Sequence, residues 1–396
     1  MPRSRVGRPP PSELKALGLA QNSHGGRMDI APRKIRYAVV GLGNIAQAAV
    51  LPAFAHATEN SELVALVSSD EEKLTVLAQR YSVKITGSYS DLDQILAGGA
   101  VDAIYVATPN TKHRTALESA ARAGVHVLCE KPLAGSVADC RSMLRTAADA
   151  KIKLMVAYRL HFEQANLRAL ERLRRGEIGD PRIFSSVFSQ QVRESDIRTS
   201  SELAGGALFD VGVYCVNAAR YLFQAEPLEV SAFQVHGKDP RFEQTDEMTC
   251  ATLRFPGDRL AQFTASQGAS AVSEFRVIGT QGDLRLDHAY GYHKESKEYL
   301  TLGGETSETV TPRHDQFAAE LSYFSRCIVD DRDPEPSGEE GLADVQILEA
   351  IVEAAKLGQR VKLSPVLRAQ RPNASLEMRK PPAPQVETVN APSPTK

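Results

Sequence analysis

The chain has 396 residues and a formal net charge of −2, which is long enough for two domains and carries no basic excess of the kind that binds nucleic acid or an anionic membrane. Hydrophobic residues make up 42% of it and charged residues 24%, as in ordinary globular proteins. The five cysteines form no Cys-x-x-Cys pair or His/Cys cluster, so we predict reduced core thiols and no metal site. No stretch has the length of a membrane span or the apolar segment of a secretory signal, which predicts a cytoplasmic protein.

The first half of the chain alternates short apolar runs with helical stretches. Residues 1–33, rich in Arg, Pro and Gly, predict a disordered leader. Strands are expected at 35–40, 63–67, 101–107, 125–129 and 153–158, with helices between them. This β-α-β alternation predicts a doubly wound parallel sheet, so we assign 34–157 to a Rossmann dinucleotide-binding domain.

The second half has a different pattern. Longer runs of alternating apolar and polar residues predict strands, and helices are expected near 163–174, 204–222 and 339–357. The expected strands are 182–189, 228–235, 248–255, 260–266 and 274–278. We therefore expect an α+β domain at 158–363 with a large, mostly antiparallel open sheet, and an α/β class for the whole chain. Residues 364–396, rich in Pro, Ala and Arg, predict a disordered tail.

A glycine motif follows the first strand directly. Gly41-x-Gly43-x-x-Ala46 has the form of a dinucleotide fingerprint: two glycines permit a tight turn and the approach of a pyrophosphate, and Ala46 lets the helix pack on the strand. The alternative is a glycine turn without a ligand. The motif follows an apolar strand and opens a helix, which is the context that a nucleotide site requires.

The end of the second strand bears on the choice between NAD and NADP. NAD enzymes place a carboxylate there for the ribose 2′-hydroxyl. This chain has Ser68 and Ser69, with Lys73 four residues later, and two hydroxyls and an ammonium suit a 2′-phosphate. Asp70 and Glu71 leave a ribose partner possible, so we favour NADP over NAD.

Lys131 stands where the strand 125–129 must stop, because Pro132 has no backbone N–H and turns the chain out of the sheet. The lysine is thereby delivered to the carboxyl edge of the sheet, where such folds bind ligands. The alternative is a solvated lysine at a strand end. Asn110 and His113 follow the neighbouring strand and are candidates for the nicotinamide side of the cleft, although His113 reads equally well as an ordinary histidine at a helix start.

Asp210 and Tyr214 lie one turn apart if this stretch is helical, and so share a face. A tyrosine beside an ammonium can be stabilised as phenolate and act as general base or acid. The alternative is a core tyrosine whose hydroxyl bonds a nearby carbonyl.

Together these stretches resemble the Gfo/Idh/MocA oxidoreductase family, most closely its glucose–fructose oxidoreductase branch, from about Ile35 to about Val361. The order and separation of Glu-Lys-Pro and Asp-x-Gly-x-Tyr are the specific part of the resemblance. The matching stretches are Gly-Leu-Gly-Asn-Ile-Ala at 41–46, Val-Ser-Ser-Asp-Glu-Glu-Lys at 67–73, Thr-Pro-Asn-x-x-His at 108–113, Cys-Glu-Lys-Pro-Leu-Ala-x-Ser-Val-Ala-Asp-Cys at 129–140, Tyr-Arg-x-His at 158–161 and Leu-Ala-Gly-Gly-Ala-Leu-Phe-Asp-Val-Gly-Val-Tyr at 203–214.

The resemblance implies hydride transfer between a sugar carbon and C4 of a nicotinamide. It implies that Lys131 orients the reacting hydroxyl, that Tyr214 takes or returns the proton, and that Asp210 and Arg198 orient substrate. It further implies a homodimer or homotetramer through the C-terminal sheet. The cofactor-binding residues that it implies are Gly41, Gly43, Asn44, Ile45, Ala46, Ser68, Ser69, Lys73, Thr108, Pro109, Asn110, His113, Glu130, Lys131 and Arg159.

Three departures limit what the resemblance carries over. Close relatives have a lysine where this chain has Asn44, and a Trp-Arg pair where it has Ile197-Arg198; there is no tryptophan in the chain. Residues 1–33 lack the twin-arginine leader of exported members. Glucose and fructose are therefore not assumed as substrates, and the expected reaction is oxidation of an aldose at C1 or reduction of a keto-sugar, with or without a retained NADP. The alternatives are a dihydrodiol or D-xylose type of dehydrogenase, favoured if the phenylalanines of 184–209 line the pocket, and an inactive nicotinamide-sensing regulator.

Overall fold

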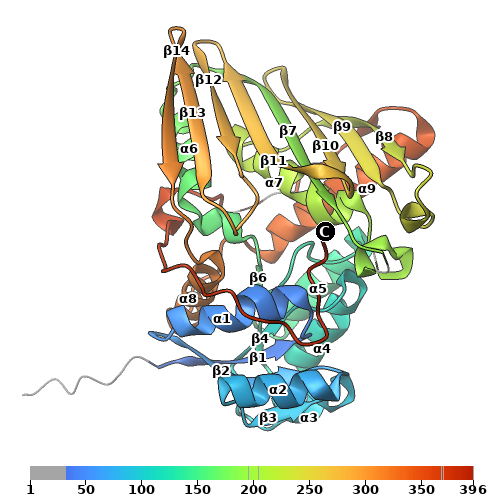
Figure 1. The fold of residues 1–396 in the computed structure, drawn as a ribbon, viewed down its shortest axis with the longest axis vertical. Coiled ribbons are helices and arrows are strands. Elements are labelled where there is room, and N and C mark those ends of the chain that lie inside the picture. Colours follow the sequence, from blue (N-terminus) through green and yellow to red (C-terminus); the bar gives the residue numbers. More distant parts are fainter. Residues whose placement is uncertain (1–32, 195, 204, 367, 369, 396) are drawn as a thin grey trace, which may run out of the picture. The chain divides into compact units, whose positions relative to one another are not determined.

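The computed structural model describes residues 33–194, 196–203, 205–366, 368 and 370–395 (Figure 1). The leader expected at 1–33 lies outside these residues apart from its last one. In the described part of the chain, six parallel strands form a sheet in the order β3-β2-β1-β4-β5-β6, hereafter the parallel sheet. Its strands are β1 Ile35–Val40, β2 Ser61–Val67, β3 Ile85–Gly87, β4 Ala103–Val106, β5 His126–Cys129 and β6 Leu154–Val156.

Helices cover both faces of the parallel sheet, as the β-α-β alternation predicts. They are α1 Leu51–Ala53, α2 Glu71–Tyr81, α3 Leu92–Ala97, α4 His113–Arg122 and α5 Val137–Asp149. The oxygen of Ser136 accepts from Asp139 N at 3.1 Å, so α5 begins with the predicted cap. The strand order reverses between β1 and β4, and the crevice at the carboxyl ends of these two strands is where such folds bind ligands.

The helix that follows β1 is irregular, as Pro52 requires. A π turn at Ala46–Val50 leads into α1, and a 3-10 turn at Phe54–His56 follows it. The backbone N–H of Leu51 bonds the carbonyl of Ala46, five residues back, which widens the helix just before the proline. The helix thus continues through Pro52 without a break. Its N-terminus still adjoins the glycine turn.

A second, larger sheet follows, and within the described residues it has nine strands in the order β14-β13-β12-β11-β7-β10-β9-β8-β15. The pair β7–β10 is parallel and the other neighbouring pairs are antiparallel, so the predicted α/β class with a mostly antiparallel second sheet is confirmed. The strands of this large sheet are β7 Pro181–Gln191, β8 Glu229–Val235, β9 Met248–Phe255, β10 Arg259–Ser266, β11 Gly268–Gly279, β12 Gly282–Asp287, β13 Ser296–Leu302, β14 Glu305–Thr311 and β15 Val361–Lys362.

One face of the large sheet is covered by α6 Gln164–Arg174, α7 Val213–Phe223 and α9 Gly338–Leu357 (Figure 1). The other face is open, and the strands alternate accordingly: in β9, Thr249, Ala251 and Leu253 are buried, whereas Cys250 and Thr252 are exposed. Several apolar side chains stand on this open face, with Phe233 of β8 79% exposed.

One helix of the C-terminal half returns to the parallel sheet. This helix, α8 Gln316–Val329, was not predicted from the sequence. The Ser325 oxygen lies 2.8 Å from both the Tyr37 hydroxyl of β1 and the Ser61 hydroxyl of β2, and Asn60 Nδ2 donates to Ser322 O at 2.8 Å. The proposed division at residue 157 therefore describes the order of the two domains along the chain. In space, α8 of the C-terminal half packs on the first domain.

The C-terminal residues follow a defined path in place of the disordered tail that composition predicts. Residues 370–395 are almost entirely irregular, with a 3-10 turn at Ala374–Leu376. They are fixed by contacts with remote parts of the chain, of which the last is a β-bridge between Val192 and Thr395. In Figure 1 this dark-red segment crosses α1 and rises toward the large sheet.

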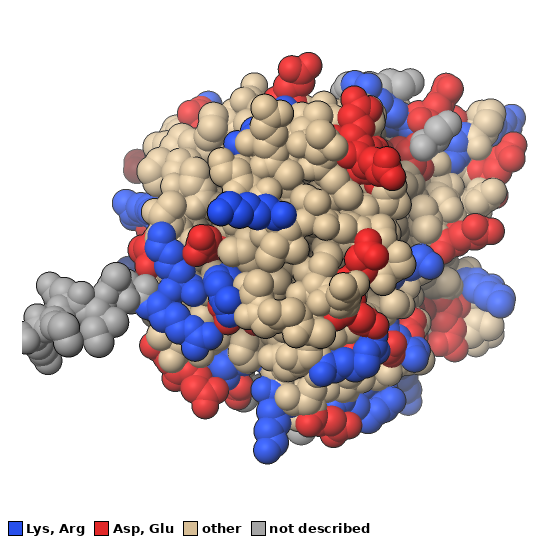
Figure 2. Space-filling view, turned by 90° about the horizontal axis from the view of Figure 1, so that it is seen from below, with Lys and Arg blue, Asp and Glu red and all other residues tan. Residues whose placement is uncertain are grey.

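The surface is mixed in charge, in keeping with the net charge of −2. In Figure 2, basic and acidic side chains are interspersed over the face that it shows. Among the helices that the structure describes, none has the length and apolar character needed to cross a bilayer.

Candidate active site

The glycine turn after β1 is built for close approach. Gly41 has φ +97°, and a Cβ on it would lie 2.7 Å from the carbonyl carbon of Ala107, so a side chain fits neither the backbone nor the space. A Cβ on Gly43 would meet no atom within 4 Å. The space over Gly43, in front of the helix that begins at Asn44, can thus take a phosphate group against free backbone N–H groups.

The end of β2 places the three residues expected to read the ribose. Ser68 is buried and its oxygen accepts from Asp70 N at 3.1 Å, whereas Ser69 is exposed. Lys73 lies on the first turn of α2, with its ammonium 3.7 Å from the Asp70 carboxylate. The pKa of Asp70 is lowered, first by the backbone N–H of Lys73, so a negative charge adjoins the site. The ammonium of Lys73 and the hydroxyls of Ser68 and Ser69 are therefore present at the end of β2. The same ammonium also interacts with the Asp70 carboxylate.

Lys131 lies at the carboxyl edge of the parallel sheet and reaches across to the second domain. Its ammonium donates to Asp210 O at 3.0 Å, lies 3.5 Å from Asp210 Oδ1, and stands 4.7 Å from the ring centroid of Tyr214. Burial lowers the pKa of Lys131, but Tyr214, Asp210 and Glu130 raise it by more, and the net pKa is raised. The lysine is thus a partly buried cation held by the second domain rather than a solvated strand end.

Asp210 is the centre of a polar cluster. It lies in a π turn, Leu208–Gly212, that runs directly into α7, so that it is one turn before Tyr214 as predicted. Its Oδ2 accepts from Arg198 Nε at 2.8 Å, from Gln267 Nε2 at 3.0 Å and from Gln190 Nε2 at 3.1 Å. Burial raises the pKa of Asp210, but Arg198 and Lys131 outweigh it and bring the pKa down to about 2.

Tyr214 lies between two cations. Arg159 NH2 donates to its hydroxyl at 3.4 Å, while Lys131 stands over its ring. Arg159 is itself buried and held by the Tyr290 carbonyl at 2.6 Å and by the side-chain oxygen of Gln316 on α8. A negative charge on the phenol oxygen would therefore meet an arginine N–H that three elements hold in place.

These groups line one cavity of about 360 Å³ between the two domains. The glycine turn supplies one wall, the loop after β4 and Lys131 a second, and the second domain a third. The lining includes Gly43, Asn44, Ile45, Thr108, Pro109, Asn110, Glu130, Lys131, Arg159, Arg198, Asp210 and Tyr214. Most of the residues predicted from sequence thus meet in one place, and the gap between lysine and tyrosine is not filled by packed hydrocarbon.

His113 is placed differently from its expected position in the cleft. It is fully buried beneath the loops, with Nδ1 3.1 Å from the carbonyls of Pro132 and Leu133 and Nε2 3.0 Å from the Thr108 carbonyl. Burial lowers its pKa. The assignment of His113 as a cofactor contact is therefore corrected: its ring lies between the loop after β4 and the loop that carries Lys131, and a ring with carbonyls at both nitrogens cannot also face the cleft.

Two buried carboxyl groups lie beneath the cavity. Glu130 accepts from the Tyr105 hydroxyl at 2.9 Å, and burial raises its pKa. Glu320 of α8 is fully buried, and within the described residues neither of its oxygens has a hydrogen-bond partner; burial, and then Glu130, raise its pKa well above the ordinary value. Burial thus disfavours the charged form of both acids.

Several lining residues were missed in the sequence. Gln190, Phe188, Tyr290 and Tyr292 come from strand ends and loops of the large sheet, without a motif, and Gln267 was missed as a partner of Asp210. Phe188 stacks on Tyr290 at 5.1 Å and lines the cavity, whereas Phe184 lies in the core against Phe275. The phenylalanines of 184–209, which would favour a dihydrodiol if they lined the pocket, thus contribute Phe188 to an aromatic wall made mainly of tyrosines.

The parallel sheet has a glycine turn at the point where its strand order reverses. It faces the large open sheet across a cavity that contains a lysine and a tyrosine. This arrangement defines a two-domain nucleotide-dependent oxidoreductase. Residues 35–158 match the model of an oxidoreductase family with an NAD-binding Rossmann fold, and residues 166–285 match the GFO/IDH/MocA C-terminal domain. The chain belongs to the Gfo/Idh/MocA oxidoreductase family, which confirms the resemblance drawn from its motifs.

Similar proteins of known activity act on sugars. The chain is 32% identical over 336 residues to a D-xylose 1-dehydrogenase (NADP(+)) of Haloarcula marismortui, covering 83% of this chain and 93% of the relative. It is similar to the crystal structure of an aldose-aldose oxidoreductase from Caulobacter crescentus complexed with glycerol, with 37% identity, a TM-score of 0.80, and coverage of 84% and 100%. A 3-ketoreductase from Actinomadura kijaniata in complex with NADP and TDP-benzene matches with 26% identity, a TM-score of 0.74, and coverage of 81% and 98%.

Proposed function

We propose that the protein is an NADP-dependent sugar oxidoreductase that transfers hydride between a sugar carbon, either aldose C1 or a keto-sugar carbonyl, and nicotinamide C4. The observation that carries this proposal is the meeting of Lys131 and Tyr214, 4.7 Å apart from ammonium to ring centroid, in a cavity that opens on the glycine turn. Hydride transfer needs a cofactor beside a group that moves a proton, and this cavity has room for both.

The residues present fit the dinucleotide. The space over Gly43 admits a phosphate, and the buried hydroxyl of Thr108 has no partner within the described residues, so it is available to a ligand at the same edge. Ser68, Ser69 and Lys73 would hold the 2′-phosphate, and Asn110 and Arg159 would flank the nicotinamide. When bound, the nicotinamide supplies the hydride acceptor or donor. An NADP preference is in line with the xylose dehydrogenase relative and the NADP-bound 3-ketoreductase.

The protein side of the reaction is a proton transfer. During oxidation, Tyr214 acts as a phenolate whose oxygen takes the proton of the reacting hydroxyl, while Lys131 donates to the same substrate oxygen and stabilises the charge that develops there. Arg159 holds the Tyr214 oxygen through its N–H, at 3.4 Å. Asp210 fixes the ammonium of Lys131 and, with Arg198, presents a polar edge to the sugar hydroxyls.

The cavity suits a small polyol. Arg198, Gln190 and Asp210 form a polar wall, and Phe188, Tyr290 and Tyr292 form an aromatic wall of the kind on which a sugar ring stacks. The aromatic wall also admits a ring diol, and the chain is 28% identical over 282 residues to a mouse trans-1,2-dihydrobenzene-1,2-diol dehydrogenase. A dihydrodiol is therefore the second candidate substrate.

Two further expectations accompany this function. The protein is expected to assemble as a homodimer or homotetramer through the open face of the large sheet, which carries exposed apolar residues such as Phe233, Val235 and Leu260. A cytoplasmic location remains a prediction from the sequence.

The function is tested by two measurements on one preparation. The purified protein is denatured and any released nucleotide is identified by mass, and the native protein is then assayed for NADPH formation with a panel of aldoses and with a trans-dihydrodiol. We expect an aldose to be oxidised with NADP⁺, and Tyr214→Phe to abolish oxidation while NADP⁺ still binds. Faster oxidation of the dihydrodiol would favour the second candidate. NADPH binding without oxidation of any sugar or diol would indicate a regulator.

A further inference from the structure

The C-terminal residues 386–395, hereafter the strap, lie along the ligand edge of the parallel sheet. Gln47, on the helix after the glycine turn, holds the strap in the manner of a paired strand: its Nε2 donates to Val389 O at 2.9 Å, and Val389 N donates to its Oε1 at 2.7 Å. Asn44 of the glycine turn donates to Ala391 O at 3.0 Å, and Ala391 is buried. The strap is thus attached to Asn44 of the glycine turn and to Gln47, one turn further along the same helix.

The contacts of the strap extend to both ends of the expected cofactor groove. Asn390 donates to Glu72 at 2.8 Å and to Asp70 at 3.3 Å, beside the residues that would hold the ribose phosphate. Arg193 N, just past β7 of the second domain, donates to Pro394 O at 2.9 Å, next to the bridge between Val192 and Thr395. The strap therefore connects the first domain to the second across the cleft.

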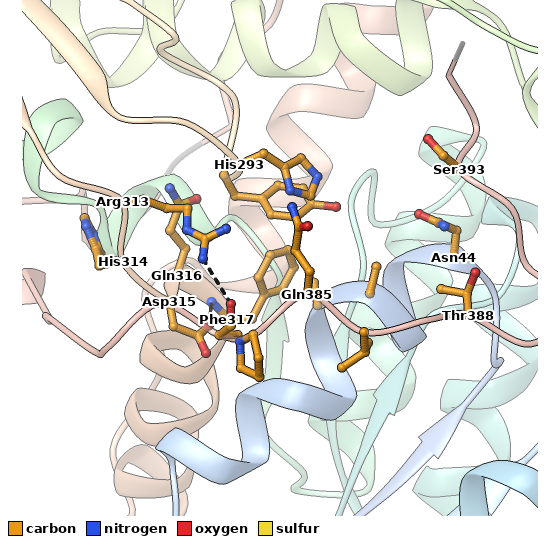
Figure 3. Close-up of a pocket in the computed structure, with 16 residues that line it drawn as sticks. Asn44, His293, Arg313, His314, Asp315, Gln316, Phe317, Gln385, Thr388 and Ser393 are labelled. Carbon is orange, nitrogen blue, oxygen red and sulfur yellow. Dashed lines mark hydrogen bonds between the residues drawn. The ribbon is translucent and has the colours of Figure 1, made fainter. Parts of the chain in front are cut away.

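The strap also forms part of the cavity walls. Ser393, Pro394 and Thr395 line the cavity that holds Lys131 and Tyr214. A neighbouring cavity of about 290 Å³ is lined by Asn44, Tyr292 and Arg313 of the body and by Gln385, Val386, Thr388 and Ser393 of the C-terminal segment. Figure 3 shows Asn44, Thr388 and Ser393 grouped at one end of that cavity, with Gln385 directed toward His293.

We propose that the strap is part of the dinucleotide-binding site and closes over the bound NADP, so that the cofactor is released slowly between turnovers. This inference rests on the proposed function. The glycine turn, the ribose corner and the catalytic cavity are three separate places that the cofactor must touch, and one segment makes hydrogen bonds at the first two and lines the third. A ligand that lies between the sheet edge and this segment leaves only after the strap has lifted.

The contacts suit a cover that opens. Among the described contacts of the strap, most are hydrogen bonds between its backbone and a side chain of the body, and Asn390 and Ser393 are solvent-exposed. Segments with few buried apolar contacts open locally at lower free energy than the core does. Slow release would let one sugar be oxidised and a second sugar be reduced by the same NADP molecule. When both sugars are aldoses, this is an aldose–aldose oxidoreduction.

The test measures nucleotide release directly. A stop codon at residue 386 removes the strap, and Asn390→Ala removes only the bonds to Asp70 and Glu72. Each protein is loaded with NADPH and mixed with excess NADP⁺, and the loss of bound-NADPH fluorescence gives the release rate. We expect release at least tenfold faster without the strap and a smaller acceleration for Asn390→Ala. Asn373→Ala is the matched control, since its side chain bonds Ser375 and Arg371, and its release rate should equal that of the wild type.

Two results would refute the proposal that the strap retains NADP. Equal release rates in the wild type and both variants would mean that the segment makes no contribution to retention. Slower release or tighter NADPH binding after truncation would mean that the segment competes for the groove. The release rate is measured without a sugar. A protein that binds NADPH but oxidises nothing therefore refutes the proposed function, while the release rates still test whether the strap retains NADP. A wild type that binds no NADPH refutes both.

Discussion

Lys131 follows the end of a strand, and its ammonium contacts Asp210 and lies over the ring of Tyr214. We predict that Lys131→Ala lowers kcat by roughly 10²–10⁴-fold, the range of acid–base assistance, and changes the Kd for NADP⁺ far less. The reason is that the ammonium contacts Asp210 and Tyr214 rather than the glycine turn. Steady-state rates with an accepted aldose and fluorescence titration with NADPH measure the two effects.

The control for charge is Lys131→Arg, which keeps a cation but not the compact ammonium, and which should recover only part of the rate. Full turnover in Lys131→Ala would remove the lysine from the mechanism.

Asp210 links the site to stability. Its pKa is held at about 2 in the folded protein, against 3.8 for an ordinary aspartate, so its stabilising effect is complete above pH 4 and is lost as the pH falls toward 2. We predict that Asp210→Asn lowers the free energy of unfolding by about 1–3 kcal/mol at pH 7, because two partly buried cations lose their partner. Urea denaturation of both proteins at pH 7, 5 and 3.5 should show the difference shrinking at the lowest pH.

Asp180→Asn is the comparison for this experiment. Asp180 pairs with Arg182 at 3.0 Å, but both side chains are about half exposed or more, so its loss should change stability by less than about 0.5 kcal/mol. A difference between wild type and Asp210→Asn that does not vary with pH would contradict the role given to this carboxylate.

At the scale of elements, the glycine turn separates a structural from a ligand-facing position. Gly41→Ala places a Cβ 2.7 Å from the Ala107 backbone at a positive φ, so we expect it to destabilise the fold or prevent its expression. Gly43→Ala meets open space, so we expect a Tm near that of the wild type and a Kd for NADPH raised at least tenfold. Thermal unfolding and NADPH titration of the two variants measure this. Unchanged binding in Gly43→Ala would place the phosphate elsewhere.

Elements with a local signal were predictable from the sequence. The alternation of strands and helices around the parallel sheet, the cap at Ser136 and the glycine turn all depend on residues close together in the chain. The convergence of Lys131, Asp210 and Tyr214 was expected only through the family resemblance, because no local pattern connects residue 131 with residue 214.

Two missed strands, β12 and β13, do alternate and could have been predicted, whereas other missed elements lack such a signal. In α8, residues 316–325 are all buried, including Gln316, Glu320 and Ser322, so the burial of this helix does not follow the polarity of its side chains. In β14, five of the first six residues are exposed at a sheet edge, so the alternation that marks a strand is absent. The strap is fixed by side chains more than 300 positions away, such as Gln47, and composition carries no trace of them.

For the whole molecule, the open face of the large sheet is the feature that bears on assembly. We predict that Phe233→Asp converts the expected dimer or tetramer to a smaller species, because a charge replaces an apolar side chain that is 79% exposed at the centre of an uncovered strand. Sedimentation velocity measures the change. Val329→Asp, at an exposed position on α8 away from the sheet, should sediment like the wild type. Identical behaviour of Phe233→Asp would exclude this face as the interface.

The return of α8 to β1 and β2 has a consequence for biosynthesis. During translation the nucleotide-binding half leaves the ribosome first, yet the helix that covers part of its sheet follows only after nearly all of the large sheet has been made. Until then, the residues that Tyr37 and Ser61 contact are missing, and an apolar surface stays open to chaperones or to neighbouring chains. The nascent N-terminal half is thus held short of its final state, and both halves complete folding together.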